Sequence, residues 1–192
     1  TAEPLVPSRS PGRAPHYAAR MVQEADLRGT PSGLVPHGPG WFVVNLEDAR
    51  WKRNERFGTF CAFEGDERFP HFGLNVHLLE PNQPACMYHR ENQQEGFLVL
   101  RGECRLIVEG EERRLKPWDY VHCPPDTNHV FVGGPDGPCA ILMIGARLAD
   151  EAIVYPVEPV AQEFGAGVHE ETPDPRRAYD GVPPSTDVPS PW

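Results

Sequence analysis

Two short segments of the sequence contain side chains that are suited to binding a metal ion. The first, YHRENQQE, contains His89, Glu91 and Glu95. These three residues share parity, so their side chains would face the same side of an extended chain. The second, PPDTNH, ends in His129, which a proline turn delivers to the start of the apolar run HVFVG. Imidazole and carboxylate groups bind Zn, Mn, Fe and Ni. His89, Glu91, Glu95 and His129 are therefore candidate ligands of one divalent metal ion per chain. The alternative is that His89 is a solvated loop histidine and that the two glutamates are surface charges.

The chemistry expected of such a site depends on the coordination positions that it leaves open. Two histidines and one carboxylate form a facial triad, in which a substrate or O₂ can occupy the remaining positions. A neighbouring glutamate or histidine would then transfer protons. The candidate catalytic residues are Glu91 and His77.

The role of His77 depends on which face of its predicted strand is turned inward. In the run FGLNVHLLE, Leu74, Val76 and Leu78 form one face, and Asn75 and His77 form the other. If the polar face is inside, His77 is an acid/base group or a hydrogen-bond partner of a metal ligand. If it is outside, His77 is a surface histidine.

Two other groups of polar residues have open interpretations. Gln93 and Gln94 border Glu95 and either hydrogen-bond a ligand carboxylate or a bound substrate, or are solvated loop amides. His122 lies seven residues before His129, and we expect it to be a hydrogen-bonded strand histidine.

The elements that position these residues are predicted to be short strands. Gly, Pro, Asn and Asp separate the candidate strands, and no helical pattern lies between them, which favours a β-sandwich or barrel. Residues 95–100 are apolar on both faces, so this strand should lie between two layers. Part of the outer wall is then covered by a terminal arm or by a second subunit. The candidate strands are 41–46, 57–63, 72–80, 95–102, 103–110, 111–117, 119–124, 129–133 and 139–147.

Residues 81–133 resemble the two conserved motifs of the cupin superfamily. His89, Glu95 and Gly102 fall in register with the His, Glu and Gly of the first motif, and Pro124 and His129 with the Pro and His of the second. The resemblance implies an all-β fold: a single jelly-roll barrel over residues 41–148, with a bound metal ion. It also implies a homodimer, since cupins often form dimers.

The sequence departs from the cupin motifs at several positions. The second histidine of the first motif is Glu91, and motif glycines are replaced by Gln83, Trp118 and Asp126. Asp and Asn adopt left-handed backbone conformations more readily than most residues, so Asp126 and Asn82 can make such turns. Glu91 either binds the metal, giving two imidazoles and two carboxylates, or points away and leaves three ligands plus water. Its charge and hard oxygen atoms shift the preference toward Mn or Fe, with Zn and Ni open.

Proline marks the ends of the predicted barrel. Of 23 prolines, seven lie in residues 1–40 and eight in residues 151–192. Proline excludes long helices and central strands, so we expect an N-terminal arm over 1–40 and a C-terminal arm over 149–192. Residues 16–28, HYAARMVQEADLR, could form one short helix within the first arm.

The composition excludes some classes of partner. The chain has 18 basic and 28 acidic side chains, a net charge of −10, and no Lys/Arg cluster, which argues against nucleic acid and anionic membranes. No apolar run is long enough to span a bilayer, and TAEPLVPSRS lacks the apolar region of a signal peptide. Five cysteines without a CxxC pair indicate reduced, buried thiols. We expect a cytoplasmic protein with a small-molecule ligand.

The sequence favours a metal-dependent, dioxygenase-like enzyme that acts on a small organic molecule. A second hypothesis is a non-catalytic protein that binds a small ligand around a structural metal. A third is a sugar isomerase or epimerase, in which the metal polarises a carbonyl. The third would need a basic phosphate site if the sugar is phosphorylated, and the arginines show no obvious convergence.

Overall fold

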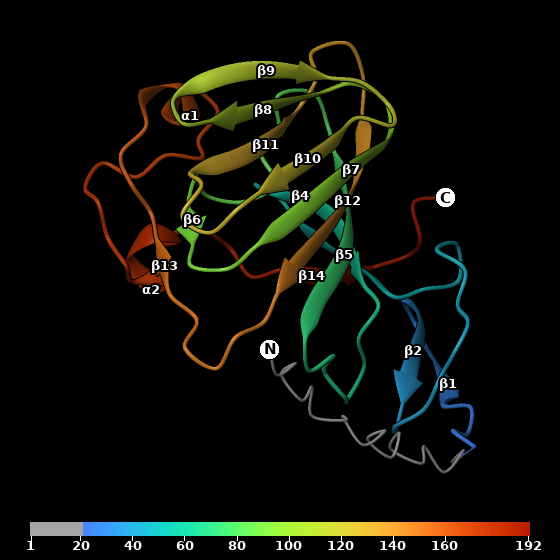
Figure 1. The fold of residues 1–192 in the computed structure, drawn as a ribbon. Coiled ribbons are helices and arrows are strands. Elements are labelled where there is room, and N and C mark those ends of the chain that lie inside the picture. The colour runs from blue at the N-terminus through green and yellow to red at the C-terminus, as the bar shows by residue number, and fades with distance from the viewer. Residues whose placement is uncertain (1–20) are drawn as a thin grey trace, which may run out of the picture.

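The computed structural model describes residues 21–192, which form mainly antiparallel strands with two small helices near the C-terminus (Figure 1). The larger sheet has seven strands in the order β10-β7-β12-β5-β4-β3-β14, and the smaller has three in the order β11-β8-β9. Among the described residues, no helix is long and apolar enough to cross a membrane. The strands of the larger sheet are β3 (Trp51–Asn54), β4 (Gly58–Ala62), β5 (Phe72–Leu79), β7 (Glu95–Arg101), β10 (Tyr120–Cys123), β12 (Cys139–Ala146) and β14 (Thr186–Val188).

The two sheets face each other and enclose the main apolar core. The smaller sheet consists of β8 (Cys104–Val108), β9 (Glu111–Leu115) and β11 (His129–Gly133). The segment 84–89 runs beside β11 and makes two isolated bridges to it, Pro84 to Val132 and His89 to His129. The enclosed side chains include Leu79, Phe97, Val99, Leu106, Phe131 and Ile141. The predicted all-β jelly-roll fold is confirmed, although the two sheets do not close into one continuous barrel.

Eight of the nine predicted strands are present, as β4, β5 and β7–β12. The strand predicted over 41–46 is wrong, because only Trp41 makes a β contact there, an isolated bridge to Glu24. Its apolar residues instead cover the outer face of the larger sheet, where Val44 and Leu46 pack around Trp51. The apolar residues of 41–46 therefore belong to a segment that packs over the sheet and not to a strand within it.

The helix predicted over 16–28 is wrong in its described part. Residues 21–25 are not helical, and β1 (Asp26–Thr30) pairs antiparallel with β2 (Gly33–His37). The tight turn between the strands explains the difference, since Thr30 Oγ1 donates a hydrogen bond to the carbonyl oxygen of Gly33 over 2.7 Å. Residues 16–20 of the predicted helix lie outside the described part of the chain.

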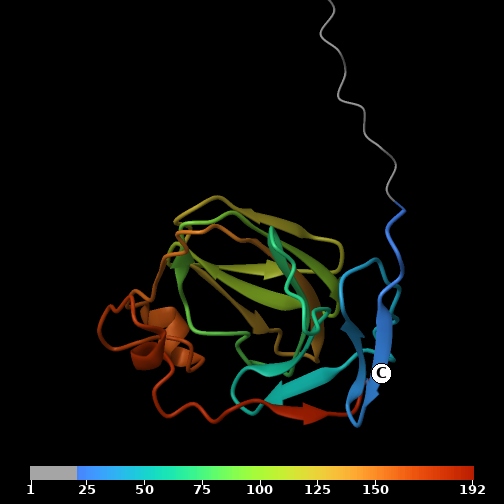
Figure 2. The same ribbon diagram turned by 90° about the horizontal axis from the view of Figure 1, so that it is seen from below.

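The C-terminal residues pack against both sheets. Helix α1 (Pro159–Glu163) lies near β8 and β9 (Figure 1), and its Ala161 packs against Ile107 and Val130 on the outer face of the smaller sheet. Cover was predicted for the strand over 95–100, and there Leu100 packs in the cluster around Trp51, together with Val44 and Leu46, and not against α1. Strand β14 pairs with β3 at the edge of the larger sheet, beside the N-terminal part of the chain (Figure 2). The remaining elements are β6 (Arg90–Glu91), β13 (Ile153–Val154), which pairs with β6, and α2 (Pro175–Ala178).

Removing the side chain of Ile107 tests whether the C-terminal arm is part of the folded unit. Ile107 is fully buried under α1, so Ile107→Ala should lower the free energy of unfolding by about 2–5 kcal/mol. Arg114→Ala, at an exposed position on the neighbouring strand β9, should change it by less than about 0.5 kcal/mol. Urea denaturation measures both. Equal stability of the two variants would mean that the arm does not cover this face in solution.

Candidate metal centre

His89 and His129 are held side by side by their own backbones. The amide of His89 donates to the carbonyl oxygen of His129 over 3.1 Å, and the amide of His129 donates back to that of His89 over 2.8 Å. This reciprocal pair joins the segment 84–89 to the first residue of β11. The two rings lie with their centroids 4.9 Å apart, and both residues are buried.

The two rings are also oriented in the same way. Nδ1 of His89 hydrogen-bonds the carbonyl oxygen of Met87 over 2.7 Å, and Nδ1 of His129 hydrogen-bonds that of Thr127 over 3.0 Å. A carbonyl oxygen can only accept, so each Nδ1 carries the proton. Each neutral ring therefore presents the lone pair of its Nε2, the arrangement found in metal-binding histidines.

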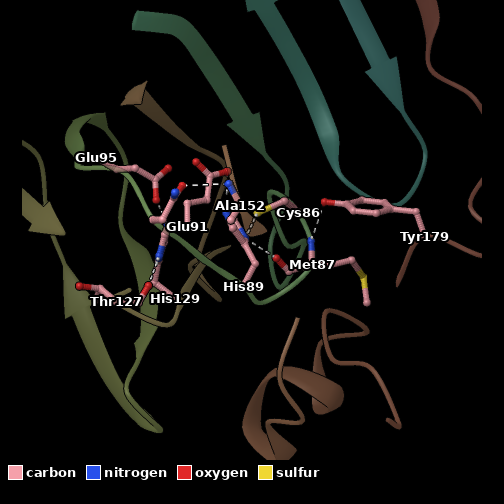
Figure 3. A network of polar contacts seen from close by, with 10 residues as sticks. Cys86, Met87, His89, Glu91, Glu95, Thr127, His129, Ala152 and Tyr179 are labelled. Atoms are coloured by element: carbon pink, nitrogen blue, oxygen red, sulfur yellow. Dashed lines mark hydrogen bonds and ion pairs between the residues drawn. The ribbon is translucent and has the colours of Figure 1, made fainter. Parts of the chain in front are cut away.

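Glu95 completes a three-residue cluster with these histidines (Figure 3). It is the first residue of β7, and its Oε2 lies 3.4 Å from His129 Nε2. One ligand atom from each of the three residues lies within 4.8 Å of the others. Two imidazole nitrogens and one carboxylate fit a divalent transition metal, so the structure brings together three of the four predicted ligands around a point where such an ion could bind.

Glu91 lies beside this cluster but outside it. Its Oε1 is 3.7 Å from Nε2 of His89, and its side chain is half-buried in the same cavity. His89, Glu91 and Glu95 all line this cavity, but residues 92–94 do not continue a strand between them, so shared parity alone does not explain their arrangement. The position of Glu91 suits either a fourth ligand or a group that reacts with a bound substrate.

The charges of the site favour a bound cation. Burial, and then the neighbouring Glu91, raise the pKa of Glu95 to about 8. Burial and the carboxylate of Glu151 also raise the pKa of Glu91. Burial, and then the neighbouring His129, lower the pKa of His89 to about 4, and burial lowers that of His129. A divalent ion would offset the repulsion between the carboxylates and use the neutral imidazoles.

The cluster opens into a cavity of about 310 Å³ between the two sheets. Phe97 and Phe131 line its inner part, and Arg147 and Glu151 lie at its rim. The guanidinium of Arg147 is occupied by Glu64, at 2.9 Å between Nη2 and Oε2, and by the carbonyl oxygen of Phe69, at 2.7 Å from Nη1. The cavity is large enough for a small organic molecule.

The structure also places the other residues that the sequence singled out. His77 faces inward and lines the cavity, together with Asn75. Gln93 is buried and lines it too, whereas Gln94 and His122 are exposed. All five cysteines are free, and Cys86 is only partly buried, at the cavity wall.

Some cavity residues were missed by the sequence reasoning. Asn75 was placed on the same strand face as His77, but no role in the cavity was predicted for it. Glu151, which lines the cavity, carried no signal of such a role, because it belongs to the C-terminal arm. The same is true of Tyr179, which does not line the cavity but contacts Met87. The hydroxyl of Tyr179 accepts a hydrogen bond from the amide of Met87 over 3.3 Å, and thereby supports the residue that orients His89 (Figure 3).

The replaced motif glycines keep the backbone conformation of glycine at two positions. Trp118 has a φ of 75° and Asp126 a φ of 67°. Asn82, next to Gln83, has a φ of 62°. The turns of the two motifs are thus preserved even where their glycines are lost, and the turn at Asp126 leads directly to His129.

Residues 75–145 match the family model Cupin_2, described as a cupin domain. This stretch contains the whole three-residue cluster and the strands that carry it, and it forms a cupin domain within the chain.

Individual cupins are related to this chain only distantly. Dimethylsulfoniopropionate lyase DddQ of Ruegeria pomeroyi is 26% identical over 144 residues, which cover 67% of each chain. A sugar phosphate isomerase from Silicibacter pomeroyi aligns with a TM-score of 0.46 and 24% identity over 56% of this chain and 66% of its own. The polyketide cyclase RemF of Streptomyces resistomycificus aligns with a TM-score of 0.49 and 19% identity, over 55% of this chain and 79% of its own. The chain thus spans slightly less than two thirds of the isomerase.

Metal titration of variants tests the cluster. Loss of a residue that only supports a ligand typically costs about 10–100-fold in metal affinity. We therefore expect His129→Ala and Glu95→Gln each to weaken Mn²⁺ or Zn²⁺ binding by at least about 100-fold. Isothermal titration calorimetry measures the affinity, and mass spectrometry of the purified protein measures the bound metal.

Glu151→Gln is the matched control, because it removes the same charge from the rim of the same cavity without touching the cluster. We expect it to change the affinity by less than about tenfold. Glu91→Gln should fall between this control and Glu95→Gln. Equal losses in Glu151→Gln and Glu95→Gln would mean that the carboxylates act only through the charge of the cavity and that Glu95 is not a ligand.

Proposed function

We propose that the protein is a metal-dependent enzyme that acts on a small organic molecule in the cavity between the two sheets. The observation that carries the proposal is the position of Glu91. Its carboxylate lies beside the His89–Glu95–His129 cluster and faces the same cavity without belonging to that cluster. A metal ion held by the cluster would polarise a bound substrate, and Glu91 would be within reach of a proton on it.

Proton removal next to a polarised group is the chemistry of elimination and isomerisation. Of these two, we propose elimination, with support from the 26% identity to a lyase. In such a reaction, Glu91 takes a proton from the carbon next to the substrate carboxylate. The electron pair of that C–H bond forms the new C=C bond, and the leaving group on the neighbouring carbon departs with the electrons of its own bond.

A dioxygenase-like activity, which the sequence favoured, is the second candidate. Two imidazoles and one carboxylate are the donor set of the facial triad, which leaves positions for a substrate and O₂. The third hypothesis, a sugar isomerase or epimerase, is less well supported for a phosphorylated sugar. Arg147 is the one arginine or lysine among the cavity-lining residues of the described chain, and its guanidinium already binds Glu64 and the carbonyl oxygen of Phe69.

An assay with dimethylsulfoniopropionate, run with and without oxygen, separates these candidates. We expect dimethyl sulfide to be released at the same rate in both conditions, measured by gas chromatography, while an oxygen electrode records no uptake. Glu91→Gln should lower kcat by at least about 100-fold, as expected for loss of a general base. It should retain metal, whereas His129→Ala should lose both metal and activity.

Glu103→Gln is the control for the charge change, because Glu103 is exposed on the protein surface away from the cavity. Oxygen uptake that accompanies product formation would replace the elimination proposal with the oxygenase. Stoichiometric metal without turnover of dimethylsulfoniopropionate or of other acids with a β-leaving group would favour the non-catalytic binding protein.

A further inference from the structure

Three buried polar atoms without a hydrogen-bond partner in the protein line the cavity. They are Oδ1 of Asn75, Nδ1 of His77 and Oε1 of Gln93. In the described part of the chain, four buried side-chain nitrogen or oxygen atoms lack a partner, and the fourth, Nε of Arg105, does not line this cavity. Unpaired polar atoms are normally rare in folded proteins, so their concentration in one place needs a physical reason.

The local structure prevents these groups from finding partners within the protein. On the inner face of the larger sheet, Asn75 lies opposite Ala62 and Met143, and His77 lies opposite Phe60 and Ile141. None of these four neighbours has a side-chain N–H or O–H group. The ring of His77 also stacks on Phe60, with 5.4 Å between centroids. Packing therefore fixes the polar groups at the cavity wall without satisfying them.

Gln93 contributes from a different part of the chain. It lies between Glu91 and Glu95 and is only 4% exposed, while the adjacent Gln94 is exposed. Its amide oxygen is thus buried beside the His89–Glu95–His129 cluster, where water does not reach it freely. A buried amide oxygen without a hydrogen-bond partner destabilises the fold. Such a group is retained where a ligand hydrogen-bonds it.

The chemistry of these atoms selects the group that would bind them. Amide oxygens accept hydrogen bonds and carry partial negative charge. The nearby carboxylates of Glu91 and Glu151 add negative charge at the same cavity, and the guanidinium of Arg147 is already paired with Glu64. The wall therefore favours a hydrogen-bond donor with positive charge and disfavours an anion.

We propose that Asn75, His77 and Gln93 form a subsite for a cationic or hydrogen-bond-donating end of the substrate, while the other end reaches the metal cluster. The inference rests on the proposed function in one respect, namely that the same cavity binds the substrate, and it names the class of that substrate. The preferred ligands are small zwitterions that carry an anion at one end and an ammonium-type cation at the other. His77 then hydrogen-bonds the substrate from the cavity wall and so helps to position it.

Four acids of similar length test this assignment by their binding to the protein as purified. They share a carboxylate and differ at the far end: 3-aminopropionate, 3-hydroxypropionate, butyrate and succinate. We expect 3-aminopropionate to bind about 10–100-fold more tightly than butyrate, because its ammonium group makes a charged hydrogen bond where butyrate has a methyl group. The hydroxyl acid should be intermediate, and succinate weakest. Isothermal titration calorimetry gives the dissociation constants without requiring turnover.

Asn75→Leu and Gln93→Leu remove one amide each and keep a side chain of similar size. Each should bring the ratio between 3-aminopropionate and butyrate toward one, while the affinity for butyrate is retained, which shows that the cavity is still folded. Gln94→Leu is the matched control, because this neighbouring amide is exposed and does not line the cavity. It should keep the wild-type ratio.

The inference is overturned if butyrate or succinate binds as tightly as 3-aminopropionate, if none of the four acids binds, or if the ratio survives in both leucine variants. A crystal structure with 3-aminopropionate in which only ordered water contacts the two amides would also overturn it. The preference for the cationic ligand without any lyase or oxygenase turnover would uphold the subsite and reject the proposed activity. Turnover without that preference would support the proposed activity and reject the subsite.

Discussion

The candidate site depends on two hydrogen bonds between the backbones of His89 and His129. They join a loop segment to the edge strand of the smaller sheet and hold two imidazoles 4.9 Å apart. In both cases the ring Nδ1 bonds the carbonyl oxygen two residues earlier in the chain, so the same local geometry is used twice. Because the backbone sets both the spacing and the direction of the rings, the site is formed before any ion binds, and little conformational freedom remains to be lost on binding.

Much of the fold and the centre of the site could be predicted from the sequence, because both depend on local patterns. Eight strands follow from apolar runs bounded by turn residues, and His89, Glu95 and His129 follow from the spacing of two motifs. The missed elements depend on distant contacts. Strand β3 has the polar sequence WKRN and is a strand because it pairs with β4 on one side and with β14, more than 130 residues later, on the other. The packing of Tyr179 under Met87 has the same long-range origin.

The apolar core and the polar cavity share the same strands. On β7, Glu95 belongs to the candidate metal-binding cluster, while Phe97 and Val99 on the same face belong to the core. On β5, Asn75 and His77 line the cavity and Leu79 is fully buried below them. Polar groups are thus confined to one end of the space between the sheets. The packed end supplies the stability that compensates for three unpaired buried atoms at the other end.

The replacement of a motif histidine by Glu91 has consequences for both charge and reactivity. An imidazole at this position would leave Glu95 as the carboxylate next to His89 and His129, whereas Glu91 adds a second carboxylate beside it. Two nearby carboxylates compete for protons, and burial raises the pKa of both. A bound divalent ion changes this balance, because it favours the ionised forms. Glu95, within the cluster, would then be committed to the ion, and Glu91, just outside it, would be left ionised and free to accept a proton from a substrate. In the proposed mechanism, the same substitution that weakens the likeness to the cupin motif is therefore the one that would supply the base.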